Sequence, residues 1–286
     1  MELRRMILLE TQRMSKANIE KVNLQTVLSQ RPLGLVFDID GTLSPIAPTP
    51  DEAQLYPGVA SLLEQAREHA HVAIMTGRAL DDGAAMVNID DITYIGSHGL
   101  EWSNGLPASH PVRVAPEAFA YLNPGRALLD LAERELATLP GIIIERKRIG
   151  GTIHYRLCFD SEQARRAILD LLEEPARRAN MRLDEGKRAI EVRTPLAINK
   201  GQALLRFMLR FGLRGMLFAG DDHTDLAAVL EIERLRQHGM DALAITVQHN
   251  DTPPELLAHA DITVHGVEGM VELLCKIVAS LQASER

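Results

Sequence analysis

The chain has 286 residues, and its 31 Lys and Arg against 39 Asp and Glu give a formal net charge of −8. Its apolar fraction of 46% and charged fraction of 24% are typical of a globular protein and exclude a disordered chain. The acidic balance argues against general binding to nucleic acid or to an anionic membrane, because both require a basic surface.

Residues 1–32 carry apolar side chains at roughly helical spacing. The pattern predicts an N-terminal helical extension that ends at Pro32, and an arm that binds a partner is the alternative. The uncharged apolar stretch at residues 6–9 is too short for a signal-peptide core, and no run approaches the ~20 residues of a membrane span. We therefore expect a cytoplasmic protein without a membrane partner.

From residue 33 onward, short apolar runs alternate with helical patterns such as residues 58–69 and 200–211. Several runs are apolar at nearly every position, which is typical of strands buried on both faces of a parallel sheet. Repeated βα units predict an α/β fold with an open, doubly wound, mostly parallel sheet. The predicted strands are Leu33–Phe37, Val72–Met75, Ile92–Ile95, Met216–Ala219, Leu243–Val247 and Ile262–Val264.

The alternation changes between residues 114 and 194. This stretch predicts a small α+β cap domain, inserted into a core made of residues 33–113 and 195–286. Gly150-Gly151 has the composition of a hairpin turn. The elements predicted for the insert are helices 126–138 and 162–180 and strands 142–147, 152–159, 181–184 and 189–193.

The two cysteines, Cys158 and Cys275, both lie in apolar runs and form no CxxC pair. We expect buried free thiols rather than a disulfide or a metal site.

Acidic residues follow two of the predicted strands: Asp38 and Asp40 come after the first, and Asp221, Asp222 and Asp225 come after the fourth. Ligands in open α/β sheets bind beyond the carboxyl ends of the strands, so these side chains are expected to converge. Unpaired carboxylates at such proximity are strongly unfavourable, and a divalent cation resolves the conflict. Oxygen ligands without cysteine or paired histidine favour Mg²⁺ over zinc.

Each of these signals has a simpler explanation when it is taken alone. Asp40-Gly41 is a common turn dipeptide, and Asp222 or Thr224 can cap the next helix. Lys200 alone would be a solvated lysine at a helix start. The combination is more specific, because the motifs follow buried strands in a mutually consistent order.

The segment Asp38-Ile39-Asp40-Gly41-Thr42-Leu43 resembles the first signature, DxDGT, of the haloacid-dehalogenase-type phosphatases. Thr76 is similar to their second signature, Lys200 to the third, and residues 220–225 to the fourth, GDDxxD. The insert lies between the second and third signatures, as in members with a large α/β cap. The resemblance covers residues 33–286 and implies a Rossmann-like core.

Within this superfamily, the chain resembles the trehalose-6-phosphate phosphatases. The core matches are residues 38–46, Pro57-Gly58-Val59, Thr76-Gly77-Arg78 and Gly96-Ser97-His98-Gly99-Leu100-Glu101. The cap matches, which are more specific for a substrate, are Glu145-x-Lys147, His154-Tyr155-Arg156 and Gly186-Lys187-x-x-x-Glu191-Val192-Arg193.

The resemblance implies a catalytic role for four core residues. Asp38 would be the nucleophile that forms an aspartyl-phosphate, and Asp40 would act first as general acid and then as general base. Thr76 and Lys200 would hold the phosphoryl oxygens.

The resemblance also implies how the acidic residues share the metal. Mg²⁺ would bind the Asp38 carboxylate, the Asp40 main-chain carbonyl and Asp221. Asp222 and Asp225 would orient the metal-bound water and Lys200.

The cap segment 145–156 is basic in an otherwise acidic chain. Glu145 and Lys147 would share one strand face, as would His154 and Arg156, and this face offers both cations and hydroxyl-binding groups to a sugar phosphate. A solvated sheet face is the simpler alternative. The substrate-binding residues implied by the resemblance are Gly77, Arg78, His98, Glu145, Lys147, His154, Arg156 and Glu191.

These inferences predict a Mg²⁺-dependent phosphatase that hydrolyses trehalose 6-phosphate, a small-molecule substrate, in trehalose biosynthesis. The alternatives are a phosphatase for another sugar phosphate, such as a glycosylglycerol or glycosyl-glycerate phosphate, and a phosphomutase. A non-catalytic sugar-phosphate sensor belongs to a different class, and the intact Asp38, Asp40, Lys200 and Asp221 count against it. The sequence does not specify the oligomeric state, and a monomer is compatible with it.

Overall fold

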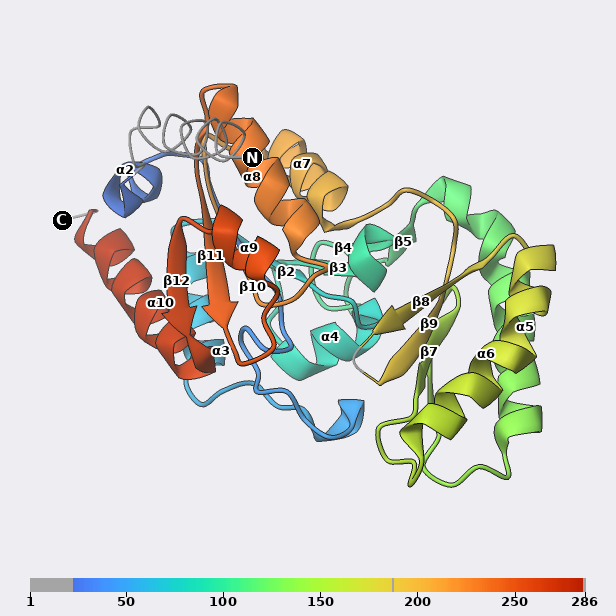
Figure 1. Ribbon diagram of the computed structural model, residues 1–286. Coiled ribbons are helices and arrows are strands. Elements are labelled where there is room, and N and C mark those ends of the chain that lie inside the picture. The colour runs from blue at the N-terminus through green and yellow to red at the C-terminus, as the bar shows by residue number, and fades with distance from the viewer. Residues whose placement is uncertain (1–22, 187, 285–286) are drawn as a thin grey trace, which may run out of the picture.

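A computed structural model describes residues 23–186 and 188–284. These residues form two units side by side, a large core around one sheet and a smaller cap around another (Figure 1). The core sheet has eight strands in the order β12-β11-β10-β1-β2-β3-β4-β5. It is parallel from β12 to β3, and β4 and β5 extend it antiparallel.

The core strands are β1 (Leu33–Phe37), β2 (His71–Met75), β3 (Thr93–Gly96), β4 (Glu101–Ser103), β5 (Arg113–Val114), β10 (Gly215–Gly220), β11 (Asp241–Gln248) and β12 (Ile262–His265). The core helices are α2 (Leu24–Leu28), α3 (Val59–Arg67), α4 (Leu80–Val87), α7 (Lys200–Phe211), α8 (Leu226–Gln237), α9 (Pro254–His259) and α10 (Gly266–Ala283). Three short 3-10 helices cover Pro50–Glu52, Ser97–Gly99 and Pro116–Tyr121.

Helices cover both faces of the core sheet, so the strands β1 and β10 are buried at every position and carry no polar side chain. On β1, Leu35 and Phe37 belong to the apolar cluster that includes residues of α3, α4 and α10. Val36, between them, belongs to the opposite cluster with residues of α7 and α8. Alternate side chains of one strand thus fill two separate clusters, as the apolar runs of the sequence predict.

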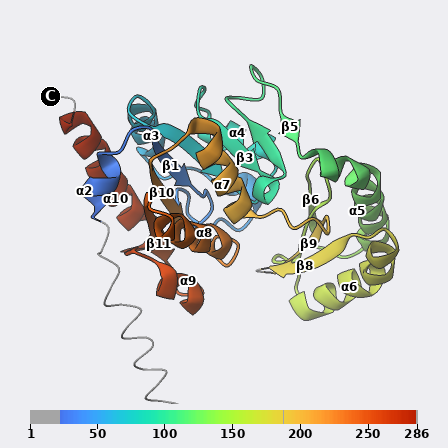
Figure 2. The same ribbon diagram turned by 90° about the horizontal axis from the view of Figure 1, so that it is seen from above.

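The cap is an antiparallel sheet in the order β6-β7-β9-β8, covered by two helices (Figure 2). Its elements are α5 (Leu122–Leu136), β6 (Ile143–Arg146), β7 (Gly151–His154), α6 (Ser161–Arg178), β8 (Arg182–Gly186) and β9 (Ala189–Arg193). Ile153, Ile190 and Val192 pack in the apolar cluster with α5 and α6. The alternate positions of β7 and β9 lie on the other face of the sheet and are polar apart from Ala189.

The structure confirms the predicted fold class: a mostly parallel α/β core with a separate antiparallel cap sheet between α4 and α7 in the chain. The bounds 114–194 for the inserted domain stay a prediction. Of the predicted turn Gly150-Gly151, Gly150 lies in the connection between β6 and β7, whereas Gly151 is already the first residue of β7. The predicted helical extension lies mostly in residues 1–22, outside the described residues, although the short α2 falls within it.

Two expectations need correction, and two short strands were not predicted. The strand predicted for residues 152–159 ends at His154, where Tyr155 leaves the ladder and its amide bonds the carbonyl of Arg188. The antiparallel strands β4 and β5 were not predicted, because three and two residues are too short to show a periodic pattern. Both cysteines are free, as expected, but Cys275 is exposed and Cys158 is only half-buried. They are not fully buried because the apolar residues next to them in the sequence face other sides of their segments.

Among the described residues, no helix has both the length and the apolar character needed to cross a bilayer.

Candidate active site

The carboxyl ends of β1 and β10 bring a lysine and three aspartates together in the interior. β1 and β10 are neighbours in register, with Phe37 beside Ala219, so the residues that follow them meet. Lys200, the first residue of α7, places its Nζ 2.8 Å from Asp38 Oδ1 and 2.6 Å from Asp225 Oδ1. Asp38, Lys200 and Asp225 are all buried. Burial lowers the pKa of Lys200, but Asp225 and Asp38 outweigh it and hold the ammonium charged.

Asp221 completes a group that fits a divalent cation. One carboxylate oxygen from each of Asp38, Asp221 and Asp225 lies within 4.8 Å of the others. Asp221 Oδ1 is buried without a hydrogen-bond partner. Burial and the neighbouring Asp38 raise the pKa of Asp221 to about 9, so its ionised form requires a compensating positive charge. A hard cation that takes oxygen ligands, such as Mg²⁺, matches this donor set.

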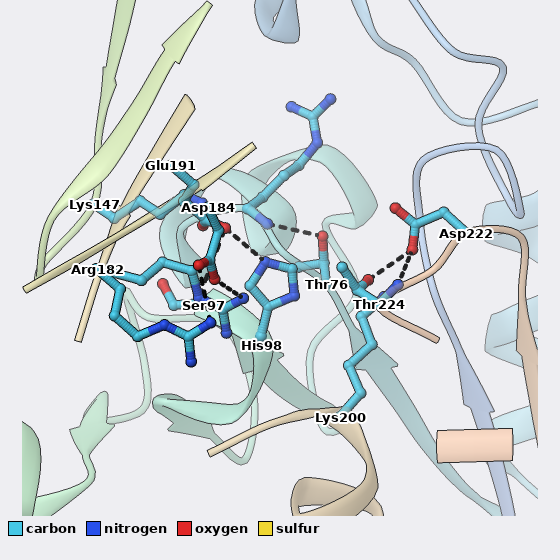
Figure 3. A network of polar contacts seen from close by, with 12 residues as sticks. Thr76, Ser97, His98, Lys147, Arg182, Asp184, Glu191, Lys200, Asp222 and Thr224 are labelled. Atoms are coloured by element: carbon cyan, nitrogen blue, oxygen red, sulfur yellow. Dashed lines mark hydrogen bonds and ion pairs between the residues drawn. The ribbon is translucent and has the colours of Figure 1, made fainter. Parts of the chain in front are cut away.

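Asp225 is held by groups of the protein rather than left open toward a ligand. Its Oδ1 accepts from Lys200, and its Oδ2 accepts from the main-chain amides of Asp221 (3.0 Å) and Asp222 (3.1 Å). Asp222 Oδ1 in turn accepts from the amide and hydroxyl of Thr224, at 2.8 and 2.7 Å (Figure 3). Asp225 therefore fixes the loop that carries Asp221.

Gly41 keeps its backbone beside the acidic group. Its φ is +82°, and a Cβ built there would lie 2.2 Å from Asp221 Oδ2. Only glycine combines this left-handed conformation with so close an approach. The carbonyl of Gly41 accepts a 2.7 Å hydrogen bond from His249 Nε2. His249 follows β11 at the same sheet edge, and the sequence analysis missed it, although a polar residue after an apolar run was the available signal.

Asp40 forms a two-pronged ion pair with Arg78. Arg78 Nε donates to Asp40 Oδ2 and its Nη2 to Asp40 Oδ1, each at 2.7 Å. The Arg78 Nη1 also donates to the carbonyl of Pro50 at 3.0 Å. Arg78 was predicted as a substrate contact; here its guanidinium is occupied by the carboxylate predicted to be the general acid.

The loops after β2 and β3 place Thr76 and His98 at the same edge. The Thr76 hydroxyl accepts from the amide of Arg78 at 3.1 Å, and the Thr76 carbonyl accepts from the amide of His98. A Cβ on Gly77 would lie 2.6 Å from His98 Cε1, so the glycine leaves room for the imidazole. Burial lowers the pKa of His98, and its Nδ1 is buried without a partner.

The polar face of the cap sheet supplies the other side of the site. His154 Nε2 donates to Glu145 Oε2 at 3.0 Å, and Lys147 forms an ion pair with Glu191. Burial alone would raise the pKa of Glu191, but Lys147 and His98 outweigh it and keep the carboxylate ionised. In the close-up, Lys147 and Glu191 lie on one side of His98 and Lys200 on the other (Figure 3).

Core and cap together enclose one cavity of about 810 Å³, a size typical of small-molecule sites. Every predicted catalytic and substrate-binding residue lines it, whereas Asp221 and Asp225 lie beneath its wall. Trp102, the only tryptophan of the chain, does not line the cavity and packs on Phe207 at 6.2 Å between ring centroids. The lining residues that the sequence analysis did not single out include Arg182, Asp184, Asn199 and His223.

A family model described as trehalose-phosphatase matches residues 36–256 of this chain. The chain therefore belongs to the trehalose-phosphatase family. The trehalose-phosphate phosphatase of Mycobacterium avium is 31% identical over 229 residues, which cover 78% of this chain and 56% of that protein. That of Mycobacterium bovis is 30% identical over 238 residues, with shares of 82% and 58%. The chain thus spans a little over half the length of these relatives.

Solved structures of the trehalose-phosphatase type share the fold. A trehalose-6-phosphate phosphatase related protein superposes with a TM-score of 0.72 at 26% identity, covering 88% of this chain and all (100%) of that chain. The C-terminal domain of Candida albicans trehalose-6-phosphate phosphatase gives the same TM-score of 0.72 at 18% identity, covering 91% and 97%. The second likeness, at this low identity, supports the fold alone.

Proposed function

We propose that this protein is a Mg²⁺-dependent phosphatase that hydrolyses trehalose 6-phosphate to trehalose and phosphate. The observation that carries the proposal is a cavity that joins a buried aspartate–lysine centre in the core to paired acidic and basic side chains in the cap. The core end suits a phosphoryl group, and the cap end suits a hydroxyl-rich leaving group. Membership of the family and the names of the relatives support the same substrate.

Asp38 is the proposed nucleophile. Its carboxylate attacks phosphorus, the bond to the sugar oxygen breaks, and an aspartyl-phosphate forms. Lys200, 2.8 Å from Asp38 Oδ1, orients the carboxylate and offsets its charge. Asp40 gives a proton to the departing sugar oxygen and later takes one from the water that hydrolyses the intermediate. For this, the phosphorylated substrate must draw Arg78 away from Asp40, which frees the carboxyl group to hold a proton.

The transferring phosphoryl group is held by donors from three loops. The Thr76 hydroxyl, the Lys200 ammonium and main-chain amides near Gly41 and Gly77 are proposed to bind its oxygens. Mg²⁺, held by Asp38, Asp221 and the Asp40 carbonyl, supplies positive charge to the phosphoryl oxygens when it is bound. Asp225 and Asp222 keep the Asp221 loop in position.

The cap residues are proposed to recognise the sugar through hydrogen bonds to its hydroxyl groups. In the sheet register, Glu145 lies beside Thr152 and Thr152 beside Glu191, so these side chains form a row across the face that lines the cavity. Carboxylates accept hydrogen bonds from sugar hydroxyls, and Lys147 and Arg156 donate to them. His154 fixes the Glu145 carboxylate at 3.0 Å.

The test is phosphate release from a panel of trehalose 6-phosphate, glucose 6-phosphate, a glycosylglycerol phosphate and 4-nitrophenyl phosphate, with Mg²⁺ or with chelator. We expect trehalose 6-phosphate to give the highest kcat/KM and the chelator to abolish turnover. Glu145→Ala is expected to lower kcat/KM for trehalose 6-phosphate roughly 10- to 100-fold, because a carboxylate that binds hydroxyls is lost, and to leave 4-nitrophenyl phosphate nearly unaffected.

The matched control for this variant is Glu133→Ala, which removes a cap glutamate that pairs with Arg146 on the helix side. A higher kcat/KM for another member of the panel reassigns the substrate. If Glu145→Ala lowers kcat/KM equally for trehalose 6-phosphate and 4-nitrophenyl phosphate, this result contradicts sugar recognition by the cap.

A further inference from the structure

Polar side chains of the cap reach the core at several points, and one of these contacts lies outside the cavity. Arg156 Nη1 donates to the carbonyl of Ala47 at 2.6 Å, and His98 Nε2 lies 3.4 Å from Glu191 Oε2. Those residues line the cavity and are proposed to bind the substrate. Arg148 makes the contact outside it, so a bound substrate does not compete for it.

Arg148 lies in the hairpin loop between β6 and β7 and pairs with two core carboxylates. Its Nη2 is 2.5 Å from Asp81 Oδ2 in the first turn of α4, and its Nε is 3.2 Å from Glu101 Oε2 on β4. The next residue, Ile149, is buried in a small apolar cluster with Leu100. Two consecutive loop residues thus dock on two consecutive residues of the core. We call Asp81, Glu101 and Arg148 the cap anchor.

Glu101 connects the cap anchor to two loops of the site. Its Oε1 accepts from the Ser97 hydroxyl at 2.7 Å, and its Oε2 accepts from the amide of Leu80 at 3.4 Å. Ser97 precedes His98 in the chain, Leu80 follows the Arg78 loop, and Arg148 follows Lys147. One carboxylate thereby joins the segments that present three cavity-lining side chains.

The electrostatics make this contact costly to break. The Glu101 side chain is 1% exposed, whereas Arg148 is 37% exposed. Burial raises the pKa of Glu101, and Ser97 and Arg148 act against it. Loss of the guanidinium would leave a buried carboxyl group with fewer partners, which disfavours any arrangement in which the hairpin leaves the core.

We propose that Arg148 and Glu101 are positioning residues that hold the β6–β7 hairpin on the core and so set the position of Lys147, which is proposed to bind the sugar. The expected effect on turnover rests on the proposed function, whereas the contact of the hairpin with the core does not. A sugar phosphate must contact core and cap at once, so it depends on this placement. A small phosphate ester that contacts the core alone does not.

The test compares Arg148→Met with Arg146→Met. Arg146 has a similar exposure, 38%, but its ion pairs are with Asp130 and Glu133 inside the cap. We expect Arg148→Met to raise KM for trehalose 6-phosphate roughly tenfold with little change in kcat or in turnover of 4-nitrophenyl phosphate. Arg146→Met is expected to leave both substrates unchanged. The double variant Arg148→Met/Glu101→Gln is expected to lose little beyond Arg148→Met, because the ion pair is already absent and the glutamine carbonyl can still accept from Ser97.

Amide hydrogen exchange provides a readout that does not depend on activity. Arg148→Met is expected to speed exchange in residues 146–151, and Arg146→Met is not. Identical exchange and kinetics in the two variants would overturn the proposal, as would equal losses on both esters in Arg148→Met. If the wild-type protein releases no phosphate from any ester, the proposed function is wrong. The hydrogen-exchange comparison then still shows whether Arg148 holds the hairpin on the core.

Discussion

Gly41 is the residue at which the acidic centre tolerates the least change. Its left-handed backbone passes close enough to the Asp221 carboxylate that a single methyl group would displace one of them. His249 holds the same peptide from the other side through the Gly41 carbonyl. The position of Asp221 is therefore set by backbone geometry as well as by hydrogen bonds.

Gly41→Ala is expected to lower kcat/KM by roughly two orders of magnitude, because displacement of the Asp221 carboxylate by about 1 Å disrupts the proposed metal site. The control is Gly58→Ala, whose φ of +89° carries similar strain but which has nothing within 4 Å of its added Cβ. Both variants are expected to lose about 1 kcal/mol of unfolding free energy. Comparable activity in the two variants would contradict the argument from close approach.

At the scale of elements, parallel pairing of β1 with β10 creates the centre. Because the strands run in register, the residues after Phe37 and Ala219 emerge at one edge, and α7 points Lys200 at the same place. The carboxylates are crowded and buried, so the metal-free protein retains protons there that an unfolded chain would release.

The stabilising effect of Mg²⁺ is expected to increase with pH. In the metal-free fold, burial and Asp38 raise the pKa of Asp221 from 3.8 to about 9, so the folded state binds more protons than the unfolded state between these values. Stability therefore falls as pH rises through this window, and a bound cation removes the fall by stabilising the ionised carboxylates. Thermal unfolding at pH 6 and pH 8.5 checks this: the Tm gain from Mg²⁺ should be larger at pH 8.5. An equal or smaller gain there would contradict the assignment.

The sequence predicted the strands of the parallel sheet to within two residues at their ends, because strands buried on both faces are continuous apolar runs. The sequence also predicted that the acidic residues of the site directly follow two of these strands. It did not predict the Arg78–Asp40 ion pair or the His249 contact, since side-chain pairing across loops depends on tertiary distances. The strands β4 and β5 were missed because they are too short for a periodic signal.

At the scale of the whole molecule, the site is assembled from segments far apart in the chain. Asp38, Glu145, Lys200 and Asp221 come from two sheets and a helix, yet all lie in or under the wall of one cavity. The order of the motifs along the sequence predicted that these side chains converge. The cap anchor could not be predicted: Glu101 belongs to a core match, but Arg148 does not differ in sequence from an ordinary surface residue, and only the docked hairpin brings the two together.

The most direct test of the central claim is to trap phosphate on the protein. In Asp40→Asn, transfer from 4-nitrophenyl phosphate to Asp38 needs no general acid, because nitrophenolate is a good leaving group, whereas hydrolysis of the acyl phosphate still needs the base. Protein quenched in acid after mixing with this ester and Mg²⁺ should carry phosphate on Asp38, as peptide mass spectrometry would report. Phosphate on another residue, or release of nitrophenol with no phosphate bound to the protein at any time, would contradict the account.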